Sequence, residues 1–219
     1  FQTAFMKTYH PVEYMAAVLT FEMGSTEKVV EYIEECKRLT MPDGSRGIKV
    51  LPPDVNISDK DFTPVTVEAV SDGPKGRGSK KSKTPHKEEV IRFGMMAVRG
   101  VGEKAVEAII EERSKGEFTS IFDFCERVDL RQVARSTIEA LVKCGAFSSF
   151  HAKRAQLLEV LERAVDMGAQ LQHDKRAGQM SMFGTPAPSP ANSGLSTQHS
   201  ALPDVPELPG ADLLKFEKE

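Results

Sequence analysis

The chain has 219 residues, of which 40% are hydrophobic and 28% are charged, and its formal net charge is −3. This length suffices for one or two ordinary domains, and no apolar run approaches the roughly 18 residues that a membrane-spanning helix needs. The first residues do not form a signal peptide, so we expect a cytoplasmic protein with no membrane partner. Because the chain opens on Phe1, we also expect it to be a piece of a longer protein.

The cysteines and histidines show no ligand spacing. Cys36, Cys125 and Cys144 are too few and too far apart for a metal knuckle or a disulfide framework. The five histidines include no H-x-E or H-E-x-x-H pair. The sequence therefore predicts no metal site in this chain and a reducing compartment.

The first third of the chain predicts two helices. Pro11 precedes VEYMAAVLTFEM, a segment that is apolar nearly all round and reads as a buried helix opened by proline. Ser25 is placed to cap a second helix, whose apolar positions Val29, Ile33 and Cys36 recur at helical spacing.

A small sheet is expected next. Residues 48–50 alternate as a short strand, and residues 62–70 and 89–93 have the composition of two arms of a β-hairpin. Between the arms, residues 72–88 are basic and rich in Gly and Ser, which predicts a disordered loop. The cations of this loop are Lys75, Arg77, Lys80, Lys81, Lys83 and Lys87.

The positive charge converges on a glycine hairpin, RGVGEK at 99–104, which directly precedes the helical pattern AVEAIIEER. Two glycines let backbone approach a phosphate, and the helix that follows points its amide-rich N-terminus there. The predicted DNA contacts are the side chains of Arg99 and Lys104 and the backbone amides of Gly100, Val101 and Gly102. A plain turn between two packed helices explains the glycines about as well.

Three further helices follow the hairpin helix. SIFDFCERV predicts a short helix with Ile121, Phe122 and Cys125 packed inward, and STIEALVKC predicts another that begins at a Ser136 cap. A long amphipathic helix is expected over residues 153–172. The fold class expected is mainly α: a helical bundle with a small β-hairpin, a helix-hairpin-helix element and a disordered proline-rich tail.

The tail reads as a linker over residues 184–210, with a last helix beginning at 211. Just before the linker, the segment QMSMF exposes apolar side chains in a polar setting. Gln179 offers an amide for backbone hydrogen bonds, and Met182 and Phe183 are typical apolar anchors for a groove. A tail that folds back on its own domain is the alternative.

Five blocks resemble one family, the α (polymerase) subunits of bacterial DNA polymerase III, which form the C-family of replicative polymerases. These blocks cover most of residues 1–165 in a single order: YHPVEYMAAVLTFEM, VLPPDVNISDKDF, IRFGMMAVRGVGEKAVEAIIEER, FTSIFDFCERVD and IEALVKCGAF. The resemblance implies a DNA-directed DNA polymerase, a nucleotidyltransferase that adds deoxynucleotides to a primer 3′ end during DNA replication.

The resemblance also implies a division of the chain. Residues 1–90 would be the distal fingers region with the β-hairpin, and 91–170 the helix-hairpin-helix region that holds the primer–template duplex. Residues 171–219 would carry a peptide that binds the sliding clamp through Gln179, Met180, Met182 and Phe183, followed by the linker. Other subunits of the polymerase III holoenzyme are further expected partners.

No catalytic residue is predicted in this chain. Polymerase chemistry needs paired carboxylates on two metal ions, whereas Asp54 stands alone after two prolines. Asp59 and Asp61 flank a lysine in a polar turn, which is typical of a solvated loop. The family holds its Mg²⁺ in a palm domain that would precede Phe1, so no cofactor is expected in this piece.

Three alternatives stay open from the sequence. One is an error-prone paralogue of the same family, although the intact clamp peptide favours the main replicase. Another is a helix-hairpin-helix DNA-repair protein, which should carry its own metal carboxylates. The third is an adaptor without enzyme activity that joins DNA to the clamp.

Overall fold

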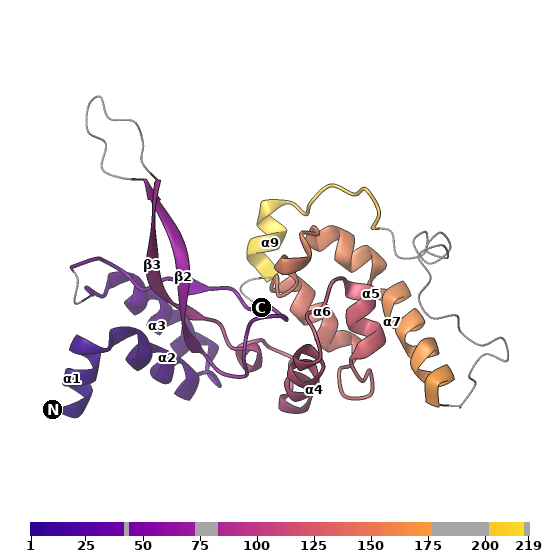
Figure 1. Ribbon diagram of the computed structural model, residues 1–219, viewed down its shortest axis with the longest axis horizontal. Helices are drawn as coiled ribbons and strands as arrows, with labels where there is room; N and C mark the ends of the chain where they lie inside the picture. Colours follow the sequence, from indigo (N-terminus) through magenta and orange to yellow (C-terminus); the bar gives the residue numbers. More distant parts are fainter. Residues whose placement is uncertain (42–43, 73–82, 177–201, 217–219) are drawn as a thin grey trace, which may run out of the picture. The chain divides into compact units, whose positions relative to one another are not determined.

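The computed structural model describes residues 1–41, 44–72, 83–176 and 202–216, and these form two compact units. One unit takes Phe1–Pro52 and Asp61–Ala97, and the other takes Pro53–Lys60 and the described residues from Val98 onward. The fold is mainly α with one small sheet, as the sequence predicts (Figure 1). Within the described ranges no helix is both long and apolar enough to cross a membrane. The domain division at residues 90 and 170 stays a prediction.

The first unit packs helices against a three-stranded sheet. Buried side chains from both layers, including Met15, Leu19, Cys36 and Ile91, form its core. Proline occupies the first turn of the second helix, which matches the prediction from Pro11. The elements are α1 (Gln2–Tyr9), α2 (Pro11–Phe21), α3 (Thr26–Arg38), β1 (Val50–Leu51), β2 (Thr63–Asp72), β3 (Lys83–Arg92) and the 3₁₀ turn η1 (Met95–Ala97).

The sheet has the order β1-β3-β2, with β1 parallel and β2 antiparallel to β3. The β2–β3 ladder runs from the pair Thr63 and Arg92 to the pair Asp72 and Lys83, so the strands project past α2 and α3 (Figure 1). The predicted hairpin is confirmed, but residues 72 and 83–88 of the predicted loop are strand, because backbone pairing continues whatever the side chains are. The rest of the predicted basic loop, 73–82, lies outside the described residues.

The second unit is a helical bundle. A chain of aromatic rings runs through its core, from Phe118 to Phe124, Phe147 and Phe150, with successive centroids 4.9, 5.1 and 5.2 Å apart. The elements are α4 (Glu103–Ser114), α5 (Ile121–Arg127), α6 (Arg135–Lys143), the 3₁₀ turn η2 (Ser148–Phe150), α7 (Arg154–Arg176) and α9 (Gly210–Phe216).

Two local predictions in this unit were wrong. Phe122 is half-buried with the Arg163 guanidinium 5.5 Å from its ring centre, whereas Phe124 is fully buried, since it shares one helical face with Ile121 and Cys125. Ser136 lies inside the first turn of α6, because the helix begins one residue earlier, at Arg135, and its N-cap residue is alanine.

The end of the predicted linker is packed. Residues 202–209 run beside the start of α7, where the Glu207 carboxylate accepts hydrogen bonds from the N–H groups of Arg154 and Ala155, both at 3.2 Å. A carboxylate at a helix N-terminus is favoured by the helix dipole. The helix predicted from residue 211 is present as α9. Residues 177–201, which include the predicted clamp-binding peptide, lie outside the described residues.

Close contact between α5 and α7 generates a stability prediction. A Cβ added at Gly168 of α7 would lie 2.4 Å from the carbonyl oxygen of Cys125, and a backbone atom cannot move aside cheaply. We expect Gly168→Ala to lower the free energy of unfolding by about 1–3 kcal/mol through overpacking, despite the better helix propensity of alanine. Urea denaturation measures this, with Gly24→Ala as the control because its Cβ meets nothing within 4 Å. Equal stability of the two variants would contradict the packing described.

Candidate nucleic-acid interface

The glycine hairpin is a tight turn between η1 and α4. Gly100 adopts φ +84°, a left-handed conformation that favours glycine. The Val101 N–H donates to Val98 O at 3.1 Å, and Gly102 then forms the N-cap of α4. The first helix of the predicted pair is only a three-residue 3₁₀ turn, so the element is an abbreviated helix-hairpin-helix.

The hairpin exposes the N-terminus of α4. Gly102 O accepts from the N–H groups of Ala105 and Val106, at 3.0 and 3.1 Å. Among the residues that the structure describes, none accepts a hydrogen bond from the N–H of Glu103 or Lys104, as is usual for the first turn of a helix. Amide donors together with the helix dipole favour a bound anion at this position.

The predicted contact residues are brought together here, with one correction. Arg99, Gly100, Gly102 and Lys104 are all exposed around the turn. Neither Arg99 nor Lys104 forms an ion pair with a described residue, which leaves both cations available to an external anion. Val101 differs, because its side chain is 8% exposed and its N–H is already donated within the turn, so its amide is not offered to a ligand.

A threonine that the sequence analysis missed holds the hairpin in place. The Thr137 hydroxyl of α6 donates to Gly100 O at 3.2 Å, and the residue is 6% exposed. Its neighbours Ile138 and Leu141 are fully buried, so this threonine lies on the core face of α6. A hydroxyl on an otherwise apolar face was the signal available in the sequence, since buried polar groups need a partner.

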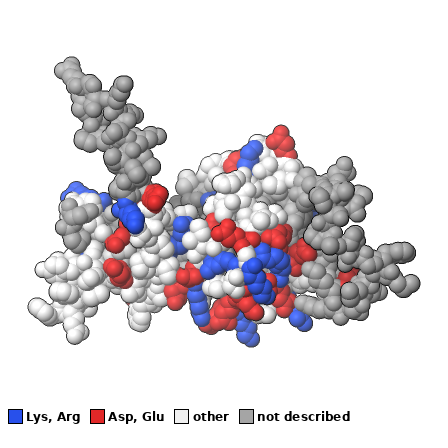
Figure 2. Space-filling model, in the orientation of Figure 1, with Lys and Arg blue, Asp and Glu red and all other residues white. Residues whose placement is uncertain are grey.

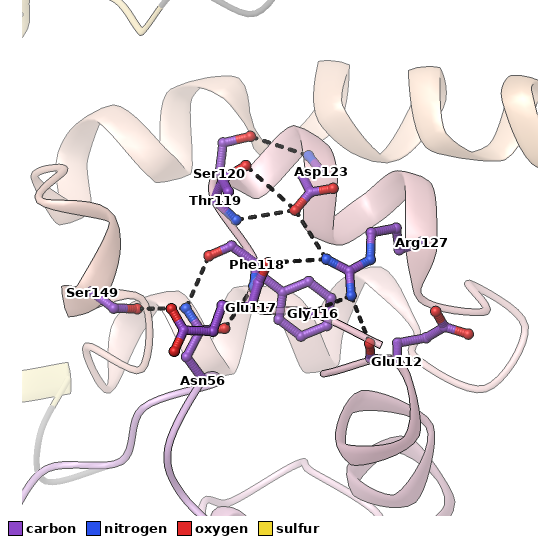
Figure 3. A network of polar contacts seen from close by, with 10 residues as sticks. All are labelled: Asn56, Glu112, Gly116, Glu117, Phe118, Thr119, Ser120, Asp123, Arg127 and Ser149. Atoms are coloured by element: carbon purple, nitrogen blue, oxygen red, sulfur yellow. Dashed lines mark hydrogen bonds and ion pairs between the residues drawn. The ribbon is translucent and has the colours of Figure 1, made fainter. Parts of the chain in front are cut away.

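The segment Pro53–Lys60 is anchored to the same unit by a half-buried amide. The Asn56 side chain accepts from the Phe118 N–H at 2.8 Å and donates to Phe118 O at 2.9 Å and to the Ser149 hydroxyl at 3.2 Å (Figure 3). One side chain therefore joins the segment to the extended residues before α5 and to η2.

A buried carboxylate provides the second anchor. Asp54 is 3% exposed, and its two oxygens accept from the Asn56 N–H at 2.8 Å and from the Ser148 hydroxyl and Ser149 N–H, both at 3.2 Å. All of these partners come from the protein, so Asp54 has a structural role here. The Val55 N–H adds a bond to Ala146 O at 2.8 Å.

Two arginines fix the far end of α4. Arg127 of α5 donates to Glu112 O and Gly116 O, both at 2.6 Å, while its guanidinium lies 4.5 Å from the Phe118 ring centre (Figure 3). A cation on the last carbonyls of a helix is the favourable complement of its dipole. Arg113, at the end of α4, donates to Ser58 O at 2.6 Å and so ties the helix to the segment Pro53–Lys60.

The start of α4 carries an ion pair. The Lys60 ammonium hydrogen-bonds the Glu103 carboxylate and lies 3.6 Å from that of Glu107, one helical turn further on. The hydrogen bond raises the pKa of Lys60 and lowers that of Glu103. The acidic residue nearest to the exposed amides is therefore paired in the structure.

The charge on this unit is local. On the face in Figure 2, basic and acidic side chains are interspersed over the helical unit, and they form no continuous basic surface among the described residues. An anion would therefore be bound by the hairpin itself, through its amides and the two adjacent cations, and not by a broad positive field.

No metal centre is found in the part of the chain that the structure describes, because no group of three or more His, Cys, Asp or Glu side chains there lies close enough to hold an ion. The cysteines serve packing, since burial raises the pKa of the Cys125 thiol to about 12 and that of Cys36 to about 11. The predicted clamp-binding residues Gln179, Met180, Met182 and Phe183 lie outside the described residues.

The chain matches one family model and is similar to several known proteins. Residues 47–157 match a family model described as "Helix-hairpin-helix motif". The chain is similar to proteins named "DNA polymerase III subunit alpha": it is 35% identical over 208 residues to that of Vibrio cholerae, with 94% of this chain and 15% of the relative covered. The Haemophilus influenzae and Escherichia coli K12 proteins are each 36% identical, over 84% and 87% of this chain. The chain spans only about 15% of the length of these relatives.

The bond from Thr137 to the hairpin can be tested. Thr137→Val keeps the shape of the side chain and removes the hydroxyl, so we expect a loss of about 0.5–1.5 kcal/mol in the free energy of unfolding. Amide hydrogen exchange should also become faster at Val101, whose N–H is bonded to Val98 O within the turn. Thr137→Ser keeps the hydroxyl and is the control for exchange rates. Unchanged exchange in the valine variant would show that the turn holds without this bond.

Proposed function

Because the chain belongs to the helix-hairpin-helix motif family, we propose that its glycine hairpin binds the phosphate backbone of duplex DNA. The observation that carries the proposal is the exposed start of α4, where N–H groups and two cations, Arg99 and Lys104, have no partner among the described residues. Backbone amides and flexible cations contact phosphate oxygens without reading base edges. Binding would therefore be independent of DNA sequence and would weaken as salt rises.

The relatives support a wider assignment. We propose that the chain is one segment of a cytoplasmic, replicative DNA-directed DNA polymerase, the activity implied by the name "DNA polymerase III subunit alpha". In the whole enzyme this segment would hold the primer–template duplex while deoxynucleotides are added to the primer 3′ end. The catalytic carboxylates and their Mg²⁺ would belong to a part of the enzyme outside this chain.

The sequence supports a clamp contact as part of the same proposal. Gln179, Met180, Met182 and Phe183 would bind a groove on a sliding clamp, with the amide hydrogen-bonding to backbone and the apolar side chains acting as anchors. Tethering to a ring on DNA raises the effective concentration of the polymerase at the primer end, so long synthesis needs no tight DNA contact. Other holoenzyme subunits would assemble around the whole enzyme.

The alternatives differ in what they require. A repair protein with this hairpin has no need of the Pro-Pro-Asp-Val-Asn segment, which in this chain anchors Pro53–Lys60. An error-prone paralogue would share the hairpin, and clamp affinity distinguishes it from the main replicase. An adaptor that only joins DNA to a clamp would share both contacts, and similarity to polymerases over 94% of the chain supports the polymerase instead.

DNA binding is tested by removing the two cations. We expect Arg99→Ala with Lys104→Ala to weaken binding to duplexes of any sequence, and to reduce the slope of log K against log salt by about two, since each neutralised phosphate contributes roughly 0.9. Fluorescence anisotropy on labelled duplexes across a salt series measures both quantities. The matched control is Lys28→Ala with Lys37→Ala, which removes the same charge from α3. An equal effect in the control would show that the hairpin is not part of the DNA interface.

Clamp binding is tested on the peptide. We expect the chain to bind a bacterial sliding clamp in surface plasmon resonance, and Gln179→Ala with Phe183→Ala to abolish the signal because both the amide and the ring anchor are lost. Ser181→Ala, which changes only an intervening residue, should bind as the unaltered chain does. No binding by the unaltered chain would contradict the clamp proposal and favour the paralogue or the repair protein.

A further inference from the structure

The Pro-Pro-Asp-Val-Asn segment leads to a lysine beside the proposed phosphate site. Lys60 is the last residue of Pro53–Lys60, and its side chain is 36% exposed at the start of α4. It pairs with Glu103 and approaches Glu107 to 3.6 Å. The lysine comes from a position more than forty residues before the helix that it meets.

The segment that presents Lys60 is held from several sides. Asp54 binds η2, Asn56 binds the residues before α5, and Ser58 O accepts from Arg113 of α4 at 2.6 Å. Asp59 adds a 2.9 Å ion pair to the same arginine. The backbone before Lys60 is thus fixed by bonds to three separate elements.

The negative charge of Glu103 lies where a phosphate would bind, and Lys60 neutralises it. As the first residue of α4, its carboxylate is stabilised by the helix dipole. The same carboxylate would repel a phosphate that approaches the amides of the first turn, and it also faces Glu107 across one helical turn. An ammonium between the two carboxylates removes both repulsions.

We propose that Lys60 is a positioning residue of the DNA interface, which neutralises and holds aside Glu103 so that the N-terminus of α4 accepts a phosphate. This inference rests on the proposed DNA binding of the hairpin. Lys60 acts through Glu103. The hydrogen bonds of Asp54 and Asn56 fix the segment and therefore fix where the Lys60 ammonium lies.

The test is a double-mutant cycle in DNA binding. Lys60→Met keeps the aliphatic stem and removes the charge, and we expect it to weaken duplex binding about threefold to fivefold at low salt, the upper part of the range for exposed charge pairs. In a Glu103→Gln background the same change should alter binding less than about twofold, because the repelling charge is gone. Lys60→Arg should bind as the unaltered chain does.

Two controls separate this role from fold stability and from the wider proposal. Lys115→Met removes a lysine that pairs with Glu112 at 2.5 Å at the opposite end of α4, and it should leave binding unchanged. Thermal unfolding should be nearly the same for all variants, because exposed ion pairs contribute little to stability. The proposed DNA binding is supported if the unaltered chain binds duplex DNA and the variant with Arg99→Ala and Lys104→Ala binds it more weakly.

If DNA binding by the hairpin is supported in this way, unchanged duplex binding by Lys60→Met would overturn the inference about Lys60. An equal loss from Lys60→Met in the unaltered chain and in the Glu103→Gln background would also overturn it, since Lys60 would then touch DNA independently of the carboxylate. If the unaltered chain fails to bind any duplex, the proposed function itself is wrong.

Discussion

The polar anchors of Pro53–Lys60, buried Asp54 and half-buried Asn56, are the constraint on which the rest of the helical unit depends. A carboxylate or amide removed from water is costly unless each polar atom finds a partner. Here the Asp54 carboxylate accepts from the backbone N–H of Asn56 and from Ser148 and Ser149. The Asn56 side-chain amide bonds the N–H and C=O of Phe118 and the Ser149 hydroxyl. A segment with such partners has one position in the fold, so everything that touches it, including α4, is positioned with it.

The orientation of α4 follows from that constraint. Arg113 joins the end of the helix to Ser58 and Asp59, and Arg127 caps the last carbonyls, so the C-terminal half is held by charged hydrogen bonds. At the other end, Gly100 and Gly102 leave the first turn open, with Thr137 holding the turn from α6. The helix is therefore fixed where it meets its own domain and exposed where its dipole favours an anion.

The sequence predicted what depends on local periodicity and missed what depends on distant partners. Helical spacing located α2, α3, α5, α6 and α7, and the glycines located the hairpin. Asp54 read as an isolated carboxylate, because its acceptor role needs Ser148 and Ser149, about ninety residues away. Phe122 was wrongly placed in the core because a seven-residue helix carries too few turns to show which aromatic faces inward.

The small number of cations at the hairpin limits how strongly it could bind DNA. Two cations and a few amides neutralise few phosphates, so on the proposed function the salt dependence is shallow and the complex short-lived. A chain with a net charge of −3 adds no general attraction for DNA. Weak backbone contact lets a protein move along a duplex, and lasting association then has to come from a second attachment. On the proposed function, the hairpin would allow movement along the duplex, and the clamp-binding peptide would keep the enzyme from dissociating.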